Sequence, residues 1–192
     1  MSDRPRYYFA YGSNLHPLRL GLRTPSCRPL GVAGLSGYAL RFNIRSDGDG
    51  SAKANAHYTG DERDRLLGIV YGIEPDDIPV LDRIEGLGPR GYRVVRERVA
   101  LERTPLEVFL YAARVTVDDS AIEAWTWYRD LVWHGARWNG FPSDYLDRIA
   151  RVPAAPDPDA ERHARNAGIL KAMPDWRPAD GYGNPLGSSD LS

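Results

Sequence analysis

The chain has 192 residues, of which 42% are hydrophobic, and a formal net charge of −1 at pH 7. A chain of this length and composition can bury most of its apolar surface within one domain. A near-neutral charge provides no long-range field for nucleic acid or for an anionic membrane, so neither is an expected partner. The only cysteine, Cys27, excludes an intrachain disulfide and a cysteine-based metal cluster. We therefore expect a cytoplasmic protein.

An unbroken apolar run, residues 7–11, stops abruptly at Gly12-Ser13-Asn14. Such a run predicts a strand that is buried on both faces. A helix is expected over residues 15–23, with Asn14 as its N-cap. A strand-loop-helix junction directs backbone N–H groups and the positive end of a helix dipole to one point, so the loop is a candidate anion site. The alternative is a structural turn in which Ser13 is satisfied locally.

A second segment, residues 74–86, has acidic residues in its first turn, prolines only near its start and a glycine at its end. These features predict a short helix. At about 3.6 residues per turn, Ile78, Leu81 and Glu85 share one stripe, so the Glu85 carboxylate should face inward. Burial and the negative end of the helix dipole would both raise the pKa of this carboxyl group, which suits proton transfer near neutral pH. The alternative is a C-terminal glutamate that extends to solvent.

Both motifs, together with Gly91-Tyr92-Arg93, resemble the γ-glutamylcyclotransferase family. The resemblance covers roughly residues 6 to 150 and includes the segments 67–71 and 136–145. It implies an α+β fold, a small mixed β-barrel flanked by helices, with a catalytic glutamate at Glu85. The substrate-binding positions that it implies are Tyr11, Gly12, Ser13, Asn14, Asn55, Tyr92 and Tyr111. Considered without the resemblance, Tyr92 and Tyr111, which lie in expected strands, would more often be core residues.

The rest of the chain agrees with this fold class. Many short strands interrupted by a few helices, with a hairpin formed by residues 92–101 and 106–113, favour an α+β barrel over a doubly wound sheet. A helix from about residue 121 to 138 carries tryptophans that we expect in the core or at a homodimer contact. Residues 1–152 are expected to form the γ-glutamylcyclotransferase-like domain. Residues 153–192 form a Pro/Gly-rich extension, expected to be partly ordered at most, with a short helix near residues 159–171.

The resemblance implies intramolecular cyclisation of a small-molecule γ-glutamyl substrate, with release of 5-oxoproline and a free amine or amino acid. The substrate's own α-amino group is the nucleophile, so the enzyme must fold the glutamyl chain and move a proton from that amine to the departing amine. One glutamate can do both in turn, and Glu85 is the candidate. The loop at Ser13 would hold either the substrate's α-carboxylate or the developing oxyanion, and the sequence does not separate these roles, nor does it identify the leaving amine.

Other chemistries lack the residues they need. Ser13 has no G-x-S-x-G elbow around it, and the four histidines are scattered without triad or metal-ligand spacing. The glycines of residues 86–91 are not followed by the Gly-Lys-Ser/Thr of a phosphate-binding loop. We therefore expect no metal and no cofactor.

A non-catalytic small-molecule-binding module of the same fold is the alternative function, because fold alone does not determine activity. The position of Glu85 on an apolar stripe discriminates between the two functions. A binding module would have no need of a buried carboxylate, which is costly to desolvate.

Overall fold

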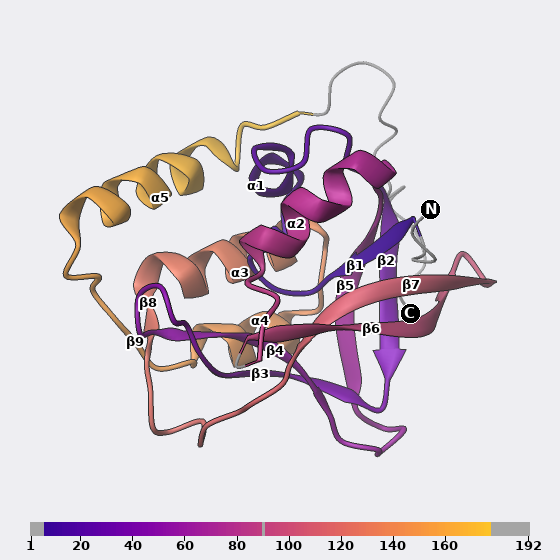
Figure 1. The fold of residues 1–192 in the computed structure, drawn as a ribbon, viewed down its shortest axis with the longest axis horizontal. Coiled ribbons are helices and arrows are strands. Elements are labelled where there is room, and N and C mark those ends of the chain that lie inside the picture. Colours follow the sequence, from indigo (N-terminus) through magenta and orange to yellow (C-terminus); the bar gives the residue numbers. More distant parts are fainter. Residues whose placement is uncertain (1–5, 90, 178–192) are drawn as a thin grey trace.

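The computed structural model describes residues 6–89 and 91–177. Its main sheet has five strands in the order β2-β5-β1-β7-β6, namely Arg28–Ser36, Arg65–Gly72, Tyr7–Ala10, Thr104–Ala113 and Tyr92–Leu101. Central strand β1 pairs antiparallel with β5 and parallel with β7, while the β2/β5 and β6/β7 pairs are antiparallel. The result is a mixed, curled sheet flanked by helices (Figure 1), which confirms the predicted α+β class.

In the view of Figure 1, the helices lie above and to the left of this sheet. Two smaller sheets pair β3 (Tyr38–Arg45) with β4 (Ala52–Tyr58) and β8 (Ala124–Trp125) with β9 (Ala154–Ala155). The helices are η1 (Ser13–Leu15), α1 (Pro17–Gly21), η2 (Pro75–Asp77), α2 (Ile78–Ile84), α3 (Thr126–Trp138), α4 (Ser143–Ala150) and α5 (Ala160–Ala172). None of the helices in the described ranges combines the length and the apolar composition that crossing a membrane requires.

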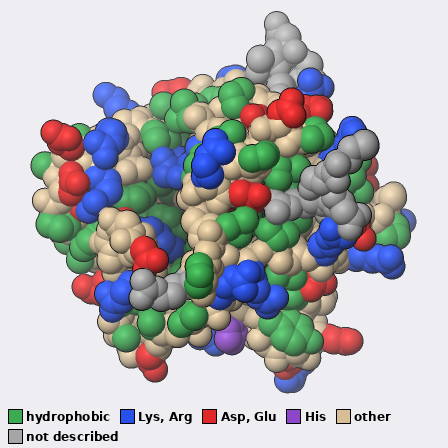
Figure 2. Space-filling view, in the orientation of Figure 1, with side chains coloured by type: hydrophobic (Ala, Val, Ile, Leu, Met, Phe, Trp, Pro, Cys, Tyr) green, Lys and Arg blue, Asp and Glu red, His purple; other side chains and the backbone are tan. Residues whose placement is uncertain are grey.

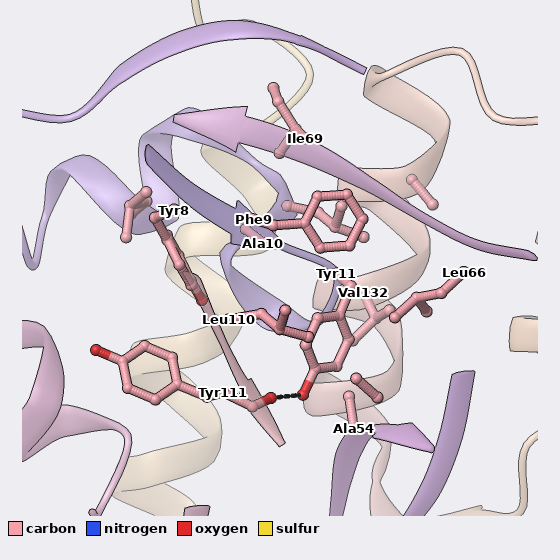
Figure 3. Packing of buried hydrophobic residues seen from close by; sticks show 14 of the residues in the cluster. Tyr8, Phe9, Ala10, Tyr11, Ala54, Leu66, Ile69, Leu110, Tyr111 and Val132 are labelled. Atoms are coloured by element: carbon pink, nitrogen blue, oxygen red, sulfur yellow. Dashed lines mark hydrogen bonds between the residues drawn. The ribbon is translucent and has the colours of Figure 1, made fainter. Parts of the chain in front are cut away.

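From Tyr8 to Ala10, strand β1 is buried on both faces, as its apolar run predicts, while Tyr7 at its start is exposed. Phe9 is fully buried on one face, where Gly68 of β5 makes room for its ring; a Cβ at that glycine would lie 2.5 Å from a ring carbon. On the other face, the Tyr8 ring stacks on the Phe109 ring of β7, with the ring centroids 5.4 Å apart. It also meets the Tyr111 ring edge-on, with the centroids 5.7 Å apart (Figure 3). The strand therefore anchors the loop that follows it to the centre of the core.

Strand β2 is not predicted by the sequence. Pro29, Gly31 and Gly34 weaken its strand pattern, because proline donates no ladder hydrogen bond and glycine has no side chain to pack. The strand tolerates them because it lies at the edge of the sheet order and has a register shift between Pro29 and Gly31. The β6/β7 hairpin is confirmed, and its two turn residues, Glu102 and Arg103, have φ of 48° and 71°.

Helix α3 packs closely on the loop that follows β1. At Gly135 a Cβ would lie 2.6 Å from the Cβ of Leu15 and 3.1 Å from the backbone nitrogen of His16. One helical turn later, the Asn139 Nδ2 donates to the Leu15 carbonyl at 2.9 Å, and the Tyr71 hydroxyl donates to the same carbonyl at 3.1 Å. The absence of a side chain at Gly135 therefore allows the helix to fix this loop.

The C-terminal part also packs on the domain. Helix α5, close to the predicted range, is preceded by Asp157, which accepts hydrogen bonds from Trp127 of α3 at 2.7 Å and from Arg162 at 2.6 Å. Beyond the helix, the Trp176 ring lies edge-on to the His16 ring, with centroids 5.7 Å apart. Part of the predicted extension is thus in contact with the domain. Residues 178–192 lie outside the described residues, and the boundary at residue 152 stays a prediction.

A glycine pair tests the close approach of α3. Gly135→Ala should lower the free energy of unfolding by about 1–3 kcal/mol, because the added methyl group overpacks the contact with Leu15. Gly168→Ala, in α5 with no atom within 4 Å of the new Cβ, should raise it by about 1 kcal/mol through helix propensity. Urea unfolding of both variants measures the two changes. A Gly135→Ala protein at least as stable as wild type would show that the contact is not tight.

Candidate active site

A cavity of about 20 Å³ lies where β1, β4, β6, β7, α2 and α3 meet. Its lining consists of Tyr8, Tyr11, Gly12, Ser13, Asn14, Ala54, Glu85, Tyr92, Tyr111 and Tyr128. The fold thus brings together all the site residues expected from the sequence except Asn55. Tyr8 and Tyr128 are lining residues that the sequence did not single out. Tyr8 alternates along β1 with the buried Phe9, a pattern that could have indicated its position.

Asn14 is not a helix N-cap, and that expectation was wrong. The cap of α1 is His16, whose Nδ1 accepts from the backbone N–H of Leu18 at 3.2 Å. The 3₁₀ turn η1 precedes it, so the α-helix starts later than expected. The buried Asn14 side chain is therefore free to donate to Glu85 Oε1 at 2.8 Å and to the Tyr8 hydroxyl at 3.2 Å.

The loop retains part of its predicted anion-binding character. Helix α1 has five residues, and η1 has three, so a helix dipole adds less than the sequence suggested. The backbone N–H groups of Ser13 and Asn14 begin the 3₁₀ turn, and the first N–H groups of a helix have no acceptor within it. Both residues line the cavity. The candidate groups for binding an anion are therefore the backbone N–H groups of Ser13 and Asn14, and a helix dipole contributes less.

Glu85 faces the cavity from the C-cap of α2. Ile78 and Leu81, on the same stripe, are buried as predicted, and the Glu85 side chain is 18% exposed. Desolvation by burial raises the pKa of this carboxyl group above its ordinary value, while Arg23 and the hydrogen bond from Asn14 act in the opposite direction. Glu85 is therefore a carboxyl group with a raised pKa at the edge of a small cavity.

Arg23 joins this site, although the sequence did not indicate it. Its Nη1 donates to Asn14 Oδ1 at 2.9 Å and lies 3.7 Å from Glu85 Oε1. Because the amide oxygen of Asn14 accepts from Arg23, the amide NH₂ group of Asn14 points towards Glu85. Arg23 thus fixes the orientation of the amide and also places a positive charge near the carboxylate.

Two tyrosines are held by the backbone of a single residue, Ala54 of β4. The Tyr92 hydroxyl donates to its carbonyl at 2.6 Å, and the Tyr128 hydroxyl accepts from its N–H at 3.1 Å. Burial raises the pKa of both phenols, that of Tyr128 to about 12, so both are neutral near pH 7. Gly12 lets the loop approach this strand, because a Cβ there would lie 3.1 Å from the Ala54 Cβ.

Tyr111 contacts a different carboxylate from the one expected to react. Its hydroxyl donates to Asp82 Oδ1 at 2.6 Å, which ties β7 to α2 one turn before Glu85. Its carbonyl accepts from the Tyr11 hydroxyl (Figure 3). The first contact holds α2, and with it Glu85, against the sheet, and the second joins the residue after β1 to β7.

Asn55 has a structural position. Its Nδ2 donates to Asn43 Oδ1 at 3.0 Å, and its Oδ1 accepts from the Ala113 backbone N–H at 2.9 Å. Both ends of the amide are therefore used to join β4 to β3 and to the end of β7. The cavity lining does not include Asn55, which corrects the expectation that it lines the pocket.

The described residues contain no group of three or more His, Cys, Asp or Glu side chains arranged to hold a metal ion. The polar side-chain groups of the cavity lining are one carboxylate, phenols, an amide and a hydroxyl. Such a set can accept, hold and return a proton and can donate hydrogen bonds to an oxyanion.

Comparison with known proteins finds similarity to one group of proteins in sequence and in structure. A profile of the AIG2-like family matches residues 65–149. The γ-glutamylcyclotransferases of Homo sapiens and Mus musculus are 28% and 29% identical to this chain over 152 residues, which are 76% of this chain and 77% of each relative. A solved structure described as γ-glutamyl cyclotransferase superposes with a TM-score of 0.74 at 25% identity, covering 86% of this chain and 97% of that chain.

The raised pKa of Glu85 predicts how stability depends on pH. The folded state holds this proton more tightly than the unfolded state, so the associated stabilisation is complete below the ordinary pKa of 4.5 and is lost as pH rises through the raised pKa. Glu85→Gln removes the titration. The Tm of Glu85→Gln minus that of wild type should therefore increase between about pH 4 and about pH 8.

Thermal unfolding across this pH range measures the difference, and Glu62→Gln, at an exposed glutamate, controls for the loss of a surface charge. A Tm difference for Glu85→Gln that falls as pH rises would contradict the assignment of a raised pKa.

Proposed function

Since the chain is a relative of the γ-glutamylcyclotransferases in sequence and in fold, we propose that it cyclises a γ-glutamyl compound to 5-oxoproline and releases a free amine or amino acid. One observation carries this proposal. A mostly buried glutamate, Glu85, lines the same small cavity as Ser13 and Asn14, the residues with which η1 begins. A proton acceptor and oxyanion donors are what this cyclisation needs from a protein.

The reaction uses groups that the substrate carries. The lone pair of the α-amino group attacks the γ-carbonyl carbon, the ring C–N bond forms, and the C–N bond to the departing amine breaks. The Glu85 carboxylate takes the proton that the α-amino nitrogen loses and returns it to the departing nitrogen. No protein nucleophile and no redox partner enters the balance. Because both reacting groups belong to one molecule, much of the rate enhancement would come from folding the glutamyl chain into a reactive conformation.

The loop after β1 has two candidate roles. Ser13 and Asn14 backbone N–H groups would bind either the substrate's α-carboxylate or the oxygen of the attacked carbonyl, and both are anionic when bound. The cavity of about 20 Å³ has room for about one water molecule, so substrate binding requires its walls to move apart. The phenols of Tyr92 and Tyr128 form part of those walls.

A panel of γ-glutamyl donors tests the proposal directly. The purified protein, with and without EDTA pretreatment, is incubated with γ-glutamyl amino acids and γ-glutamyl amines, and 5-oxoproline and the free amine are measured by mass spectrometry. We expect both products in equal amounts from at least one donor. Binding of donors without release of 5-oxoproline would favour the non-catalytic module, and turnover that is lost with EDTA would contradict a metal-independent mechanism.

Matched carboxylate variants test the role of Glu85. Glu85→Gln keeps the shape of the side chain and removes proton transfer, so it should lower kcat by about 10²- to 10⁴-fold. Asp82→Asn changes a neighbouring carboxylate that accepts from Tyr111, and its amide oxygen can still accept, so the loss of kcat should be much smaller. If Glu85→Gln retains more than about a tenth of wild-type kcat, Glu85 is not the general base.

Arg23 variants test the electrostatic part of the site. Ionised Glu85 is the active base, and the positive charge of Arg23 favours ionisation, so Arg23→Gln should raise the pKa of Glu85 further. The acidic limb of the kcat/KM profile should then move to higher pH. Arg23→Lys retains the charge and should restore part of the shift, while Arg28→Gln, at an exposed position, is the control. An acidic limb that stays in place, or moves to lower pH, in Arg23→Gln would contradict this role.

A further inference from the structure

A second cavity, of about 540 Å³, lies between α4, strand β3 and the segments around residues 63–65 and 119–122. We call it the α4 cavity. It shares no lining residue with the cavity at Glu85. Its volume falls within the range of about 300 to 1,000 Å³ that is typical of small-molecule sites.

The floor of the α4 cavity is apolar and fixed. Phe42 of β3 and Tyr145 and Ile149 of α4 line it, and all three are buried members of the core. The Tyr145 hydroxyl accepts from the backbone N–H of Leu67 at 3.3 Å, which joins α4 to β5. A flat apolar group can therefore be covered there without rearranging the core.

The rim of the α4 cavity is strongly basic. Five arginines and two aspartates line it, for a net charge of +3: Arg41, Arg63, Arg65, Arg148 and Arg151 with Asp64 and Asp119. Three of the arginines are already paired: Arg41 with Asp119 at 2.8 Å, Arg63 with Asp61 at 2.6 Å and Arg148 with Asp144 at 3.8 Å. Within the described part of the chain, Arg65 and Arg151 form no ion pair. Guanidinium groups without carboxylate partners at a shared rim favour an anionic ligand.

The backbone of β2 helps to place one of these guanidinium groups. A Cβ at Gly34 would lie 2.0 Å from the Nε of Arg65 and 2.8 Å from its Cζ. The side chain of Arg65 therefore lies directly over the glycine, in space that any other residue would occupy. The Arg148 guanidinium is placed in a similar way, 5.0 Å from the centroid of the Tyr145 ring. The Arg65 side chain thus lies against β2, and the Arg148 side chain lies against Tyr145.

We propose that the α4 cavity binds a small organic anion, a carboxylate carried on an aromatic or aliphatic body. The apolar body would cover Phe42, Tyr145 and Ile149, and the carboxylate would pair with Arg65 and Arg151 at the rim. Carboxylates match the fork of a guanidinium group, and the apolar floor selects against small inorganic anions. The proposal does not depend on the reaction at Glu85.

Calorimetric titration of the full chain with 2-naphthoate tests this site, with the neutral 2-naphthamide as a matched probe. We expect 2-naphthoate to bind at least about tenfold more tightly than 2-naphthamide, because a charge-assisted hydrogen bond is worth about 1.5 kcal/mol or more. Arg151→Glu should weaken naphthoate binding by about tenfold or more, whereas Arg98→Glu, on β6, should not change it. Ala39→Trp, which fills the cavity from β3, should abolish binding of both probes.

Glu85→Gln tests whether the two cavities are independent. Because Glu85 does not line the α4 cavity, this variant should bind 2-naphthoate as tightly as wild type does. Circular dichroism checks that each variant is folded, and Arg65→Gln gives a second test of the rim. The proposal is overturned if 2-naphthoate does not bind, if the amide binds as tightly, if the folded Arg151→Glu and Arg65→Gln variants bind normally, or if Glu85→Gln abolishes binding.

Discussion

The 2.8 Å hydrogen bond from Asn14 to Glu85 is the contact on which the site depends. A carboxylate that is mostly desolvated needs a hydrogen-bond donor to remain ionisable. A strongly interacting cation would lower its pKa so far that it would be too weak a base. An amide is a neutral donor, and the Arg23 guanidinium lies 2.9 Å from the amide oxygen and 3.7 Å from the carboxylate, so its charge also acts on Glu85 directly. Burial can therefore raise the pKa of Glu85 while the group remains able to lose its proton.

The rest of the fold holds the two ends of this contact. Asn14 is placed by β1, which is buried in the centre of the sheet, and by α3, which approaches the next residue, Leu15, at Gly135 and donates to its carbonyl. Glu85 is placed by α2, which is tied to β7 through the hydrogen bond from Tyr111 to Asp82. The surface view shows basic and acidic side chains interspersed with apolar ones over the face drawn (Figure 2). The charges that act on the pKa of Glu85 are those of Arg23 and Arg19.

The sequence predicts the elements that local periodicity determines. The apolar run before Gly12 and the stripe of Ile78, Leu81 and Glu85 predict where the two main parts of the site lie, and the structure places both at one cavity. Contacts between distant segments could not be predicted. Asparagine is a common N-cap residue, but His16 is the N-cap of α1, and the Asn14 amide instead donates a hydrogen bond to Glu85. Arg23 and Asn55 carry no local signal, since their partners are set by how α1 and β4 pack.

The central claim is that Glu85 has a raised but still accessible pKa set by burial and by the Arg23–Asn14 pair. Carbon-13 NMR of the glutamate side-chain carboxyl groups, with Glu85→Gln used to assign the signal, measures this pKa directly across a pH titration. We expect a midpoint above the ordinary value of 4.5 in wild type and a still higher midpoint in Arg23→Gln. A wild-type midpoint at or below 4.5, or a midpoint that does not respond to Arg23→Gln, would contradict this account.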